Sequence, residues 1–172
     1  MIDLSNYKIV SNEVYYLKKK PINIDKDDVH KLISLAKKND SKKIRLCFHD
    51  SIDSTVHEML IVHSKSTYVK PHKHLNKEET LMVLEGSLDY VVFNNMGEVR
   101  EIISMGNYES GKSFHQIIPK QTYHMIIIKS EWLVFKEVTQ GPFNKESTFF
   151  APWAPDEKNT KKISAYIKKI KK

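Results

Sequence analysis

The stretch PHKHLNKEETLMVLEG, residues 71–86, has the alternation of two short β-strands joined by a turn. His72 and His74 are two residues apart, so on a strand both imidazoles lie on the same face. After the turn, Glu79 shares a strand face with the apolar side chain of Leu81. A carboxylate on an apolar face is costly to bury unless it is paired or bound to a metal. The stretch therefore predicts two strands that present metal-binding side chains to an apolar interior.

The same strand-like pattern extends in both directions from this stretch. Between residues 44 and 138, short runs rich in Val, Ile, Tyr and Phe are separated by turns at residues 85–87, 94–97, 110–111 and 129–131. No intervening stretch has the length of a helical crossover, so we expect antiparallel sheets in a sandwich or barrel. Before this region, residues 7–18 predict an extended arm. Asp25 is typical of a helix N-cap, and the helix continues to about Lys38.

Composition assigns the chain to the ordinary globular proteins. Its 172 residues are 40% hydrophobic and 28% charged, which excludes disordered and fibrous classes. No apolar run approaches the roughly 20 residues of a membrane-spanning helix. The single cysteine, Cys47, cannot form an internal disulfide, and the N-terminus lacks the pattern of a signal peptide. We therefore expect a cytoplasmic protein with no membrane span.

The net charge of +7 is concentrated at one end of the chain. Residues 157–172 contain seven lysines and one glutamate, whereas the remainder has 21 basic and 20 acidic residues. A nearly neutral body argues against nucleic acid as a partner. Within the basic tail, Ile163, Tyr166, Ile167 and Ile170 have helical spacing. We expect this apolar stripe to pack on its own domain, with docking to a membrane surface as the alternative.

A fourth metal-binding residue follows later in the chain. His124 begins an apolar run and is preceded by Pro119, while Gly86 lies seven residues after Glu79. We predict that His72, His74, Glu79 and His124 bind one divalent transition metal. Three imidazoles and a carboxylate suit Zn, Fe, Mn, Ni or Cu, and the absence of thiolates argues against a closed structural zinc site.

These spacings resemble the two motifs of the cupin superfamily, G-x5-H-x-H-x3-4-E-x6-G and G-x5-P-x-G-x2-H-x3-N. The chain matches at the residues just named and departs at Ser66, Ser113, Gln121 and Ile128. Serines replace the two leading glycines, glutamine replaces the internal glycine, and isoleucine replaces the final asparagine. These are turn and packing positions, so the departures affect local geometry more than the ligand set.

A closer resemblance is to the WbuC family of cupin-fold metalloproteins. It rests on RLCFHD, HEML, YVKPHKHLNKEET, VLEGSLDYVVFNNMGEV, GPF and FFAPWAPDE, and covers about residues 7–157. The resemblance implies an all-β cupin double-stranded β-helix, or jelly-roll barrel, in residues 41–156. An N-terminal arm and helix, residues 1–40, would precede it, and the lysine-rich tail, residues 157–172, would form a short basic helix. It also implies a homodimer and a role in bacterial surface-polysaccharide (O-antigen) biosynthesis.

Strand alternation suggests residues that line a substrate pocket. Arg45, Cys47 and His49 share one face of their strand, which faces either solvent or the barrel mouth. The planar guanidinium of Arg45 suits a phosphate or carboxylate such as a nucleotide-sugar carries, and His49 can donate a hydrogen bond. The alternative for Arg45 is a surface salt bridge. Cys47 and Tyr123 are expected in the core.

Two functions remain open from the sequence. One is a metal-dependent enzyme, such as an isomerase, epimerase or oxygenase, acting on a sugar or nucleotide-sugar. The other is a non-catalytic metal-containing module that binds a saccharide or regulates a partner. A general acid or base near the metal would favour the enzyme, and the sequence identifies none. His30, His63 and His115 have no partner pattern, so we expect them to be structural or exposed to solvent.

Overall fold

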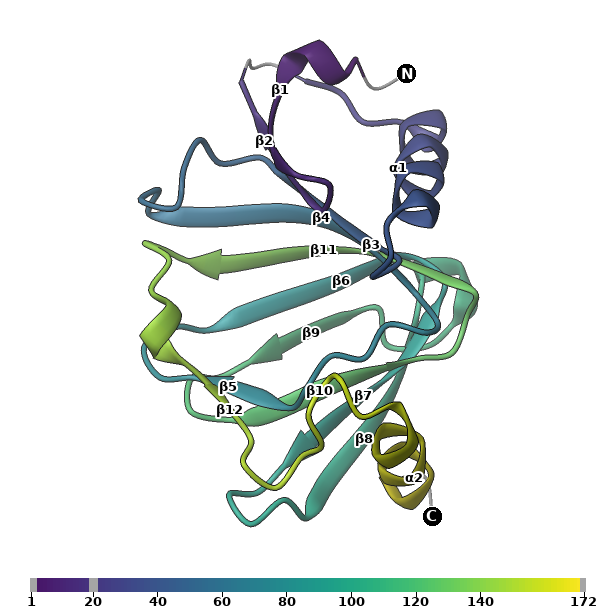
Figure 1. The fold of residues 1–172 in the computed structure, drawn as a ribbon, viewed down its shortest axis with the longest axis vertical. Coiled ribbons are helices and arrows are strands. Elements are labelled where there is room, and N and C mark those ends of the chain that lie inside the picture. The colour runs from purple at the N-terminus through teal and green to yellow at the C-terminus, as the bar shows by residue number, and fades with distance from the viewer. Residues whose placement is uncertain (1–2, 19–21, 171–172) are drawn as a thin grey trace.

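The computed structural model describes residues 3–18 and 22–170, in which β-strands form two sheets (Figure 1). The seven-stranded sheet has the order β1-β2-β3-β4-β11-β6-β9, and the five-stranded sheet has the order β12-β5-β10-β7-β8. The strands are β1 (Tyr7–Ser11), β2 (Val14–Leu17), β3 (Lys43–Cys47), β4 (Val56–Ser64), β5 (His72–His74), β6 (Glu79–Glu85), β7 (Ser87–Phe93), β8 (Val99–Gly106), β9 (His115–Ile118), β10 (Tyr123–Ile128), β11 (Trp132–Gln140) and β12 (Thr148–Phe150). The α-helices are α1 (Lys26–Lys38) and α2 (Thr160–Ile170).

The way in which the eight strands from β4 through β11 pair with one another defines the topology. Strand β4 pairs with β11, β5 with β10, β6 with β9 and β7 with β8, all antiparallel. The pairs nest inside one another, as in a long hairpin folded over into two sheets, and this is a jelly roll. The pairs β11–β6 and β10–β7 complete the sheets. The predicted all-β fold, a cupin-type double-stranded β-helix, is confirmed by this strand order.

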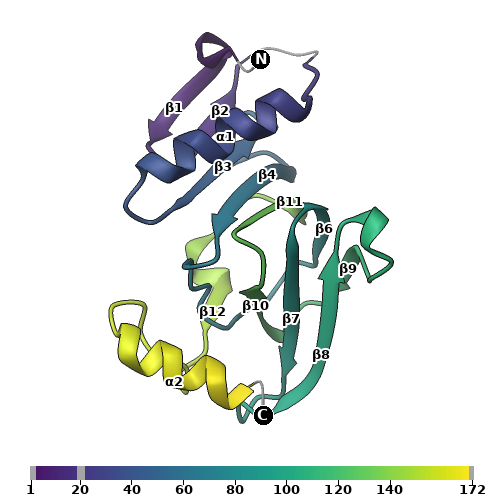
Figure 2. The same ribbon diagram turned by 90° about the vertical axis from the view of Figure 1, so that its right-hand side faces the viewer.

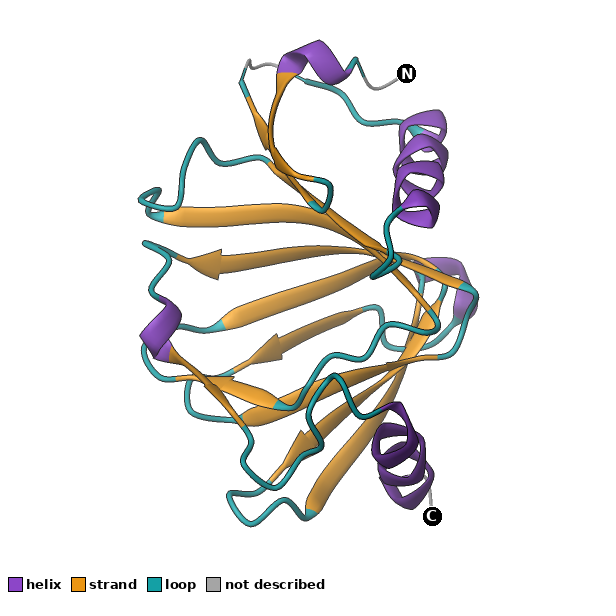
Figure 3. Cartoon of the chain, viewed as in Figure 1, coloured by secondary structure: helices purple, strands orange, loops and turns teal. Residues whose placement is uncertain are grey.

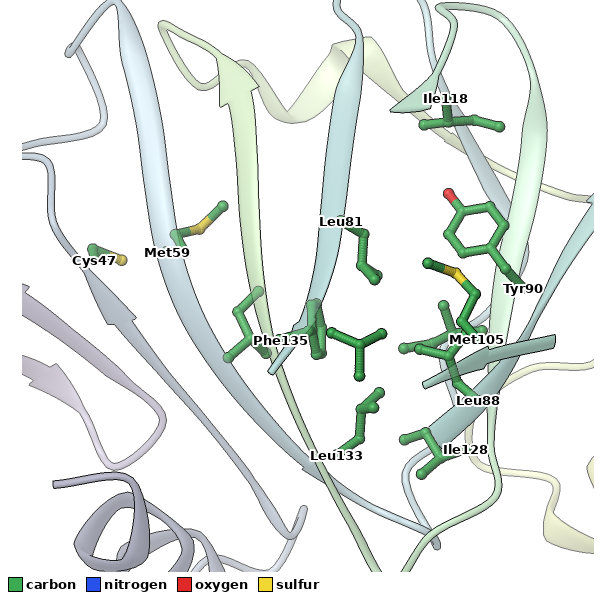
Figure 4. Packing of buried hydrophobic residues seen from close by; sticks show 13 residues of the cluster. Cys47, Met59, Leu81, Leu88, Tyr90, Met105, Ile118, Ile128, Leu133 and Phe135 are labelled. Atoms are coloured by element: carbon green, nitrogen blue, oxygen red, sulfur yellow. The ribbon is translucent and has the colours of Figure 1, made fainter. Parts of the chain in front are cut away.

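The main core lies between the two sheets. Figure 4 shows Leu81 and Phe135 from the seven-stranded sheet and Leu88 and Tyr90 from the five-stranded sheet pointing into the same interior. Strand alternation explains this arrangement, because every second residue of a strand faces the core. Cys47 belongs to the same cluster and is buried, as predicted.

Helix α1 packs on the outside of the seven-stranded sheet (Figure 2). Asp25 is its N-cap, and the Asp25 side chain accepts a hydrogen bond from the backbone N–H of Asp28 at 3.0 Å. Leu32 and Ala36 are fully buried against Ile44 and other residues on the outer face of β3 and β4. The predicted helix and its cap are therefore confirmed.

The N-terminal segment differs from the expected arm. Strands β1 and β2 form an antiparallel hairpin, and β2 then pairs with β3 in parallel. The expectation of antiparallel pairing covered residues 44–138, where the named strand pairs are antiparallel, and the parallel pairing of β2 with β3 adds to it. The physical reason for the parallel pair is α1, which lies between β2 and β3 in the chain and supplies the crossover that parallel strands need.

Helix α2 packs on the outer face of the five-stranded sheet, at the opposite end of the molecule from α1 (Figures 1 and 3). Ile163 and Ile170 are buried, and Tyr166 and Ile167 pack against a cluster that includes Val91. The apolar stripe therefore packs on its own domain, as predicted. Neither helix in the described ranges is long and apolar enough to cross a membrane. The division of the chain at residues 40 and 156 stays a prediction.

Candidate metal centre and cavity

Four side chains from three strands converge at one end of the barrel. His72 and His74 lie on β5, Glu79 begins β6, and His124 lies on β10 directly opposite His72 in the strand register. One potential ligand atom from each of the four residues lies within 4.8 Å of the others. Metal–ligand bonds of about 2.1 Å separate neighbouring ligand atoms by about 3–4 Å, so the cluster has dimensions that suit one ion.

The imidazole rings are oriented by hydrogen bonds on their far side. Nδ1 of His72 lies 2.9 Å from the carbonyl oxygen of Lys70, and Nδ1 of His124 lies 2.9 Å from that of Thr122. A carbonyl oxygen only accepts hydrogen bonds, so each Nδ1 carries the proton and each neutral ring keeps a lone pair on Nε2. Nε2 of His124 is buried without a hydrogen-bond partner. This pattern is typical of metal-ligating histidines.

Glu79 supplies the negative charge of the cluster. Its Oε2 atom lies 3.0 Å from Nε2 of His74, and its Oε1 atom lies 3.8 Å from Nε2 of His124. Burial opposes ionisation, but the hydrogen bond from His74 and the electrostatic interaction with the three histidines outweigh it and lower the pKa of Glu79 to about 2. Burial also lowers the pKa of His72 to about 4. Near neutral pH the cluster therefore offers the carboxylate of Glu79 and the neutral imidazoles of His72 and His124, the forms that bind metals.

A cavity of about 400 Å³ adjoins this cluster, and its lining includes all four residues. The inner faces of β3, β4, β6 and β11 form one wall. Ile61 and Phe135 make part of that wall apolar, while Arg45, Lys77 and Glu137 supply charged groups. Volumes of 300–1,000 Å³ are usual for small-molecule sites.

Glu137 is the chemically notable residue that sequence reasoning missed. It lies on β11, two residues before Thr139 and on the same face of the strand. Thr139 pairs with Glu79. Burial, followed by repulsion from Glu79, raises the pKa of Glu137 to about 8. The signal was available, because Glu137 shares a strand face with Phe135, just as Glu79 shares one with Leu81.

Tyr90 brings a hydroxyl group to the same cavity. Its ring stacks on the ring of His124 with centroids 5.7 Å apart, and its hydroxyl is buried without a hydrogen-bond partner. Burial and the nearby carboxylates of Glu79 and Glu137 raise the pKa of Tyr90 well above its usual value. The hydroxyl therefore stays protonated and can donate a hydrogen bond.

The other residues singled out from the sequence occupy varied positions. Arg45 is exposed and lines the cavity. His49 is not among the described lining residues; it is buried and stacks on His57, with ring centroids 4.0 Å apart. His63 also lines the cavity, and its ring packs edge-on against Phe135. Tyr123 is buried as predicted, and the two remaining candidates, His30 and His115, are exposed.

Comparisons with known proteins give a family of unstated function and several solved structures. A family described as a domain of unknown function, DUF6016, matches residues 24–105. No curated protein matches the chain. An oxalate decarboxylase from Lactobacillus farciminis in complex with formate is 21% identical, with a TM-score of 0.45, over 56% of this chain and 27% of that one.

Two further structures are similar at the same level. An uncharacterized Klebsiella pneumoniae protein with a double-stranded β-helix domain is 14% identical, with a TM-score of 0.48, over 63% of this chain and 79% of that one. A sugar phosphate isomerase of the cupin superfamily from Silicibacter pomeroyi is 18% identical, with a TM-score of 0.41, over 51% and 52% of the two chains. The strand order, rather than these similarities, assigns the fold of this chain.

Proposed function

We propose that this protein is a metal-dependent enzyme in which His72, His74, Glu79 and His124 bind one divalent transition metal, Zn, Fe, Mn or Ni. The observation that carries the proposal is the convergence of four donor groups within 4.8 Å beside a cavity of about 400 Å³. Three of the four residues are buried, and the carboxylate compensates part of the charge of a divalent ion. An ion that takes six ligands, such as Mn, Fe or Ni, would keep positions for substrate when four of its ligands come from the protein.

The groups around the cavity favour an enzyme over a non-catalytic binding module. When bound, the metal would act as a Lewis acid on a carbonyl or hydroxyl oxygen. Glu137 faces the same cavity and burial raises its pKa, so its carboxyl group is a candidate to exchange a proton with a bound molecule. The Tyr90 hydroxyl can donate a hydrogen bond to the substrate. A module that only binds a saccharide has no need of such a carboxyl group.

The substrate class and setting rest on the resemblance to the WbuC family. We propose a sugar or nucleotide-sugar of O-antigen biosynthesis as substrate, with Arg45 as a direct contact and His49 as a residue that supports the site. His49 would act indirectly through the stacked ring of His57, which lines the cavity. A homodimer follows from the same resemblance, and a cytoplasmic location from the single cysteine, Cys47.

The metal assignment is tested by measuring metal content with mass spectrometry. We expect about one equivalent in the wild type and almost none in His74→Ala, because the ring nitrogen and its contact with Glu79 are both lost. His115→Ala, which removes an exposed histidine, should retain the metal. Full metal content in His74→Ala, or failure of the wild type to take up any of the four metals, would contradict the proposal.

A further inference from the structure

Two basic side chains reach the cavity from different parts of the chain. Arg45 lies on β3, in the strand register opposite Ile61 of β4, and Lys77 lies in the turn between β5 and β6. Both line the cavity together with the four residues of the candidate metal centre. Arg45 is exposed, whereas Lys77 is half-buried. The cavity therefore has a positively charged wall in addition to its metal-binding end.

Glu79 and Glu137 lie near enough to attract the charge of Lys77, but neither basic group is held in direct contact by a described carboxylate. Within the described parts of the chain, the side chains of Arg45 and Lys77 form no ion pair and no hydrogen bond, in contrast to Lys129, which pairs with Asp89 at 2.9 Å. The two like charges thus lie near one cavity without an ion-pair partner among the described residues.

Glu137 is the carboxyl group on the same wall, and within the described residues it forms no ion pair with Arg45 or Lys77. Its pKa is raised to about 8 even though Arg45 and Lys77 both favour its ionised form. An anion delivered by a ligand would satisfy both cations.

We propose that Arg45 and Lys77 form an anion-binding subsite, and that its ligand is a small molecule with one carboxylate or phosphate group. The uncharged end of that molecule would then extend toward His72, His74, Glu79 and His124. This second part rests on the proposed function, whereas the anion subsite itself does not require the metal.

The dimensions and lining of the cavity limit the size of this ligand. About 400 Å³ is near the lower end of small-molecule sites, which suits a monosaccharide phosphate or a sugar acid. A nucleotide-sugar has more than twice as many non-hydrogen atoms, so its nucleotide would have to lie outside the cavity. The apolar side chains of Met59, Ile61 and Phe135 can cover the C–H face of one sugar ring. This narrows the substrate class to monosaccharide-sized anions.

The test is calorimetric titration of the metal-loaded, full-length protein with glucose 6-phosphate, glucuronate, glucose and UDP-glucose. We expect glucose 6-phosphate, glucuronate or both to bind, and glucose to bind at least tenfold more weakly. Whichever of the two anions has the higher affinity shows whether the subsite prefers a phosphate or a carboxylate group. Arg45→Gln and Lys77→Gln should each weaken that anion about tenfold or more, because each removes a charge-assisted contact. Arg100→Gln, at the only other arginine, and Lys112→Gln are matched exposed controls and should change affinity less than twofold.

Three results would overturn the proposal. They are no binding of either small anion at millimolar concentration, equal affinity in Arg45→Gln and Arg100→Gln, or UDP-glucose binding more than tenfold tighter than both small anions. Inorganic phosphate titrated into chelator-treated protein separates this proposal from the metal assignment. If chelator-treated protein binds phosphate and this binding is lost in Arg45→Gln and Lys77→Gln, the subsite is supported even if the metal assignment fails. Full metal content in Arg45→Gln with unchanged phosphate affinity overturns the subsite alone.

Discussion

The Oγ1 atom of Thr148 lies 3.1 Å from Nδ1 of His74, although 74 residues separate them in the chain. Strand β12 makes this contact, because it pairs with β5 in a register that sets Thr148 opposite His74. The rings of His72 and His124 are instead oriented by hydrogen bonds from Nδ1 to backbone carbonyl oxygens of nearby residues. His74 therefore depends on a side chain that only the completed fold brings to it.

Replacing Thr148 with valine should weaken metal binding by about 10- to 100-fold, since the isosteric side chain no longer holds the His74 ring. Thr148→Ser keeps the hydroxyl and should stay close to the wild type. Thr80→Val is the matched control, because the Thr80 hydroxyl donates to the carbonyl of Val138 away from the cluster. Competition with a chromophoric chelator measures the affinity. Equal affinity in Thr148→Val and wild type would show that this contact does not orient the ligand.

Gly86 illustrates why its motif position requires glycine. It has a φ of +88°, and an added Cβ would lie 2.3 Å from the carbonyl oxygen of Trp132 and 2.4 Å from Oγ of Ser130. The turn between β6 and β7 thus packs directly against the chain at the start of β11. A side chain there requires backbone movement as well as an unfavourable φ.

Gly86→Ala should lower the free energy of unfolding by about 2–4 kcal/mol, measured by urea denaturation. Gly111→Ala is the control, since Gly111 also has a positive φ, +68°, but an added Cβ would meet nothing within 4 Å. It should cost only about 1 kcal/mol, the strain of the backbone alone. If the two variants lost the same free energy of unfolding, the backbone near Trp132 would be able to move away from the added Cβ at no cost.

The sequence was sufficient for the features that depend on local alternation. Glu79 and Leu81 face inward and Leu84 is exposed, as the period of two predicts. Asp25 caps α1 as its residue type predicts. Each of these assignments needs only the pattern of neighbouring residues, because strand faces and helix caps are decided within a few positions.

Features that depend on pairing between distant segments could not be predicted from the pattern of neighbouring residues. The parallel pairing of β2 with β3 depends on where α1 packs, and the Thr148 contact depends on β12 reaching β5. Gln121, which departs from the cupin motif, has a φ of +63°, so the position keeps the backbone conformation that glycine favours. Its backbone N–H donates to the carbonyl oxygen of His74 at 2.6 Å, a tertiary contact that offsets the strain.

Glu137 gives the molecule a distinct dependence of stability on pH. Because burial raises its pKa to about 8 from an ordinary value of 4.5, the folded state keeps a proton that the unfolded state has lost between these two values. The free energy of unfolding should therefore fall as pH rises through this window, by up to about 1.4 kcal/mol per pH unit, and the contribution should level off above pH 8.

Glu137→Gln removes this contribution because glutamine does not ionise. In chelator-treated protein, its stability relative to wild type should increase from pH 5 to pH 8, measured by urea denaturation at each pH. Glu58→Gln, on the outer face of β4 where Glu58 pairs with Lys136, is the control and should keep the wild-type slope. Parallel profiles for Glu137→Gln and wild type would mean that Glu137 is ionised at neutral pH.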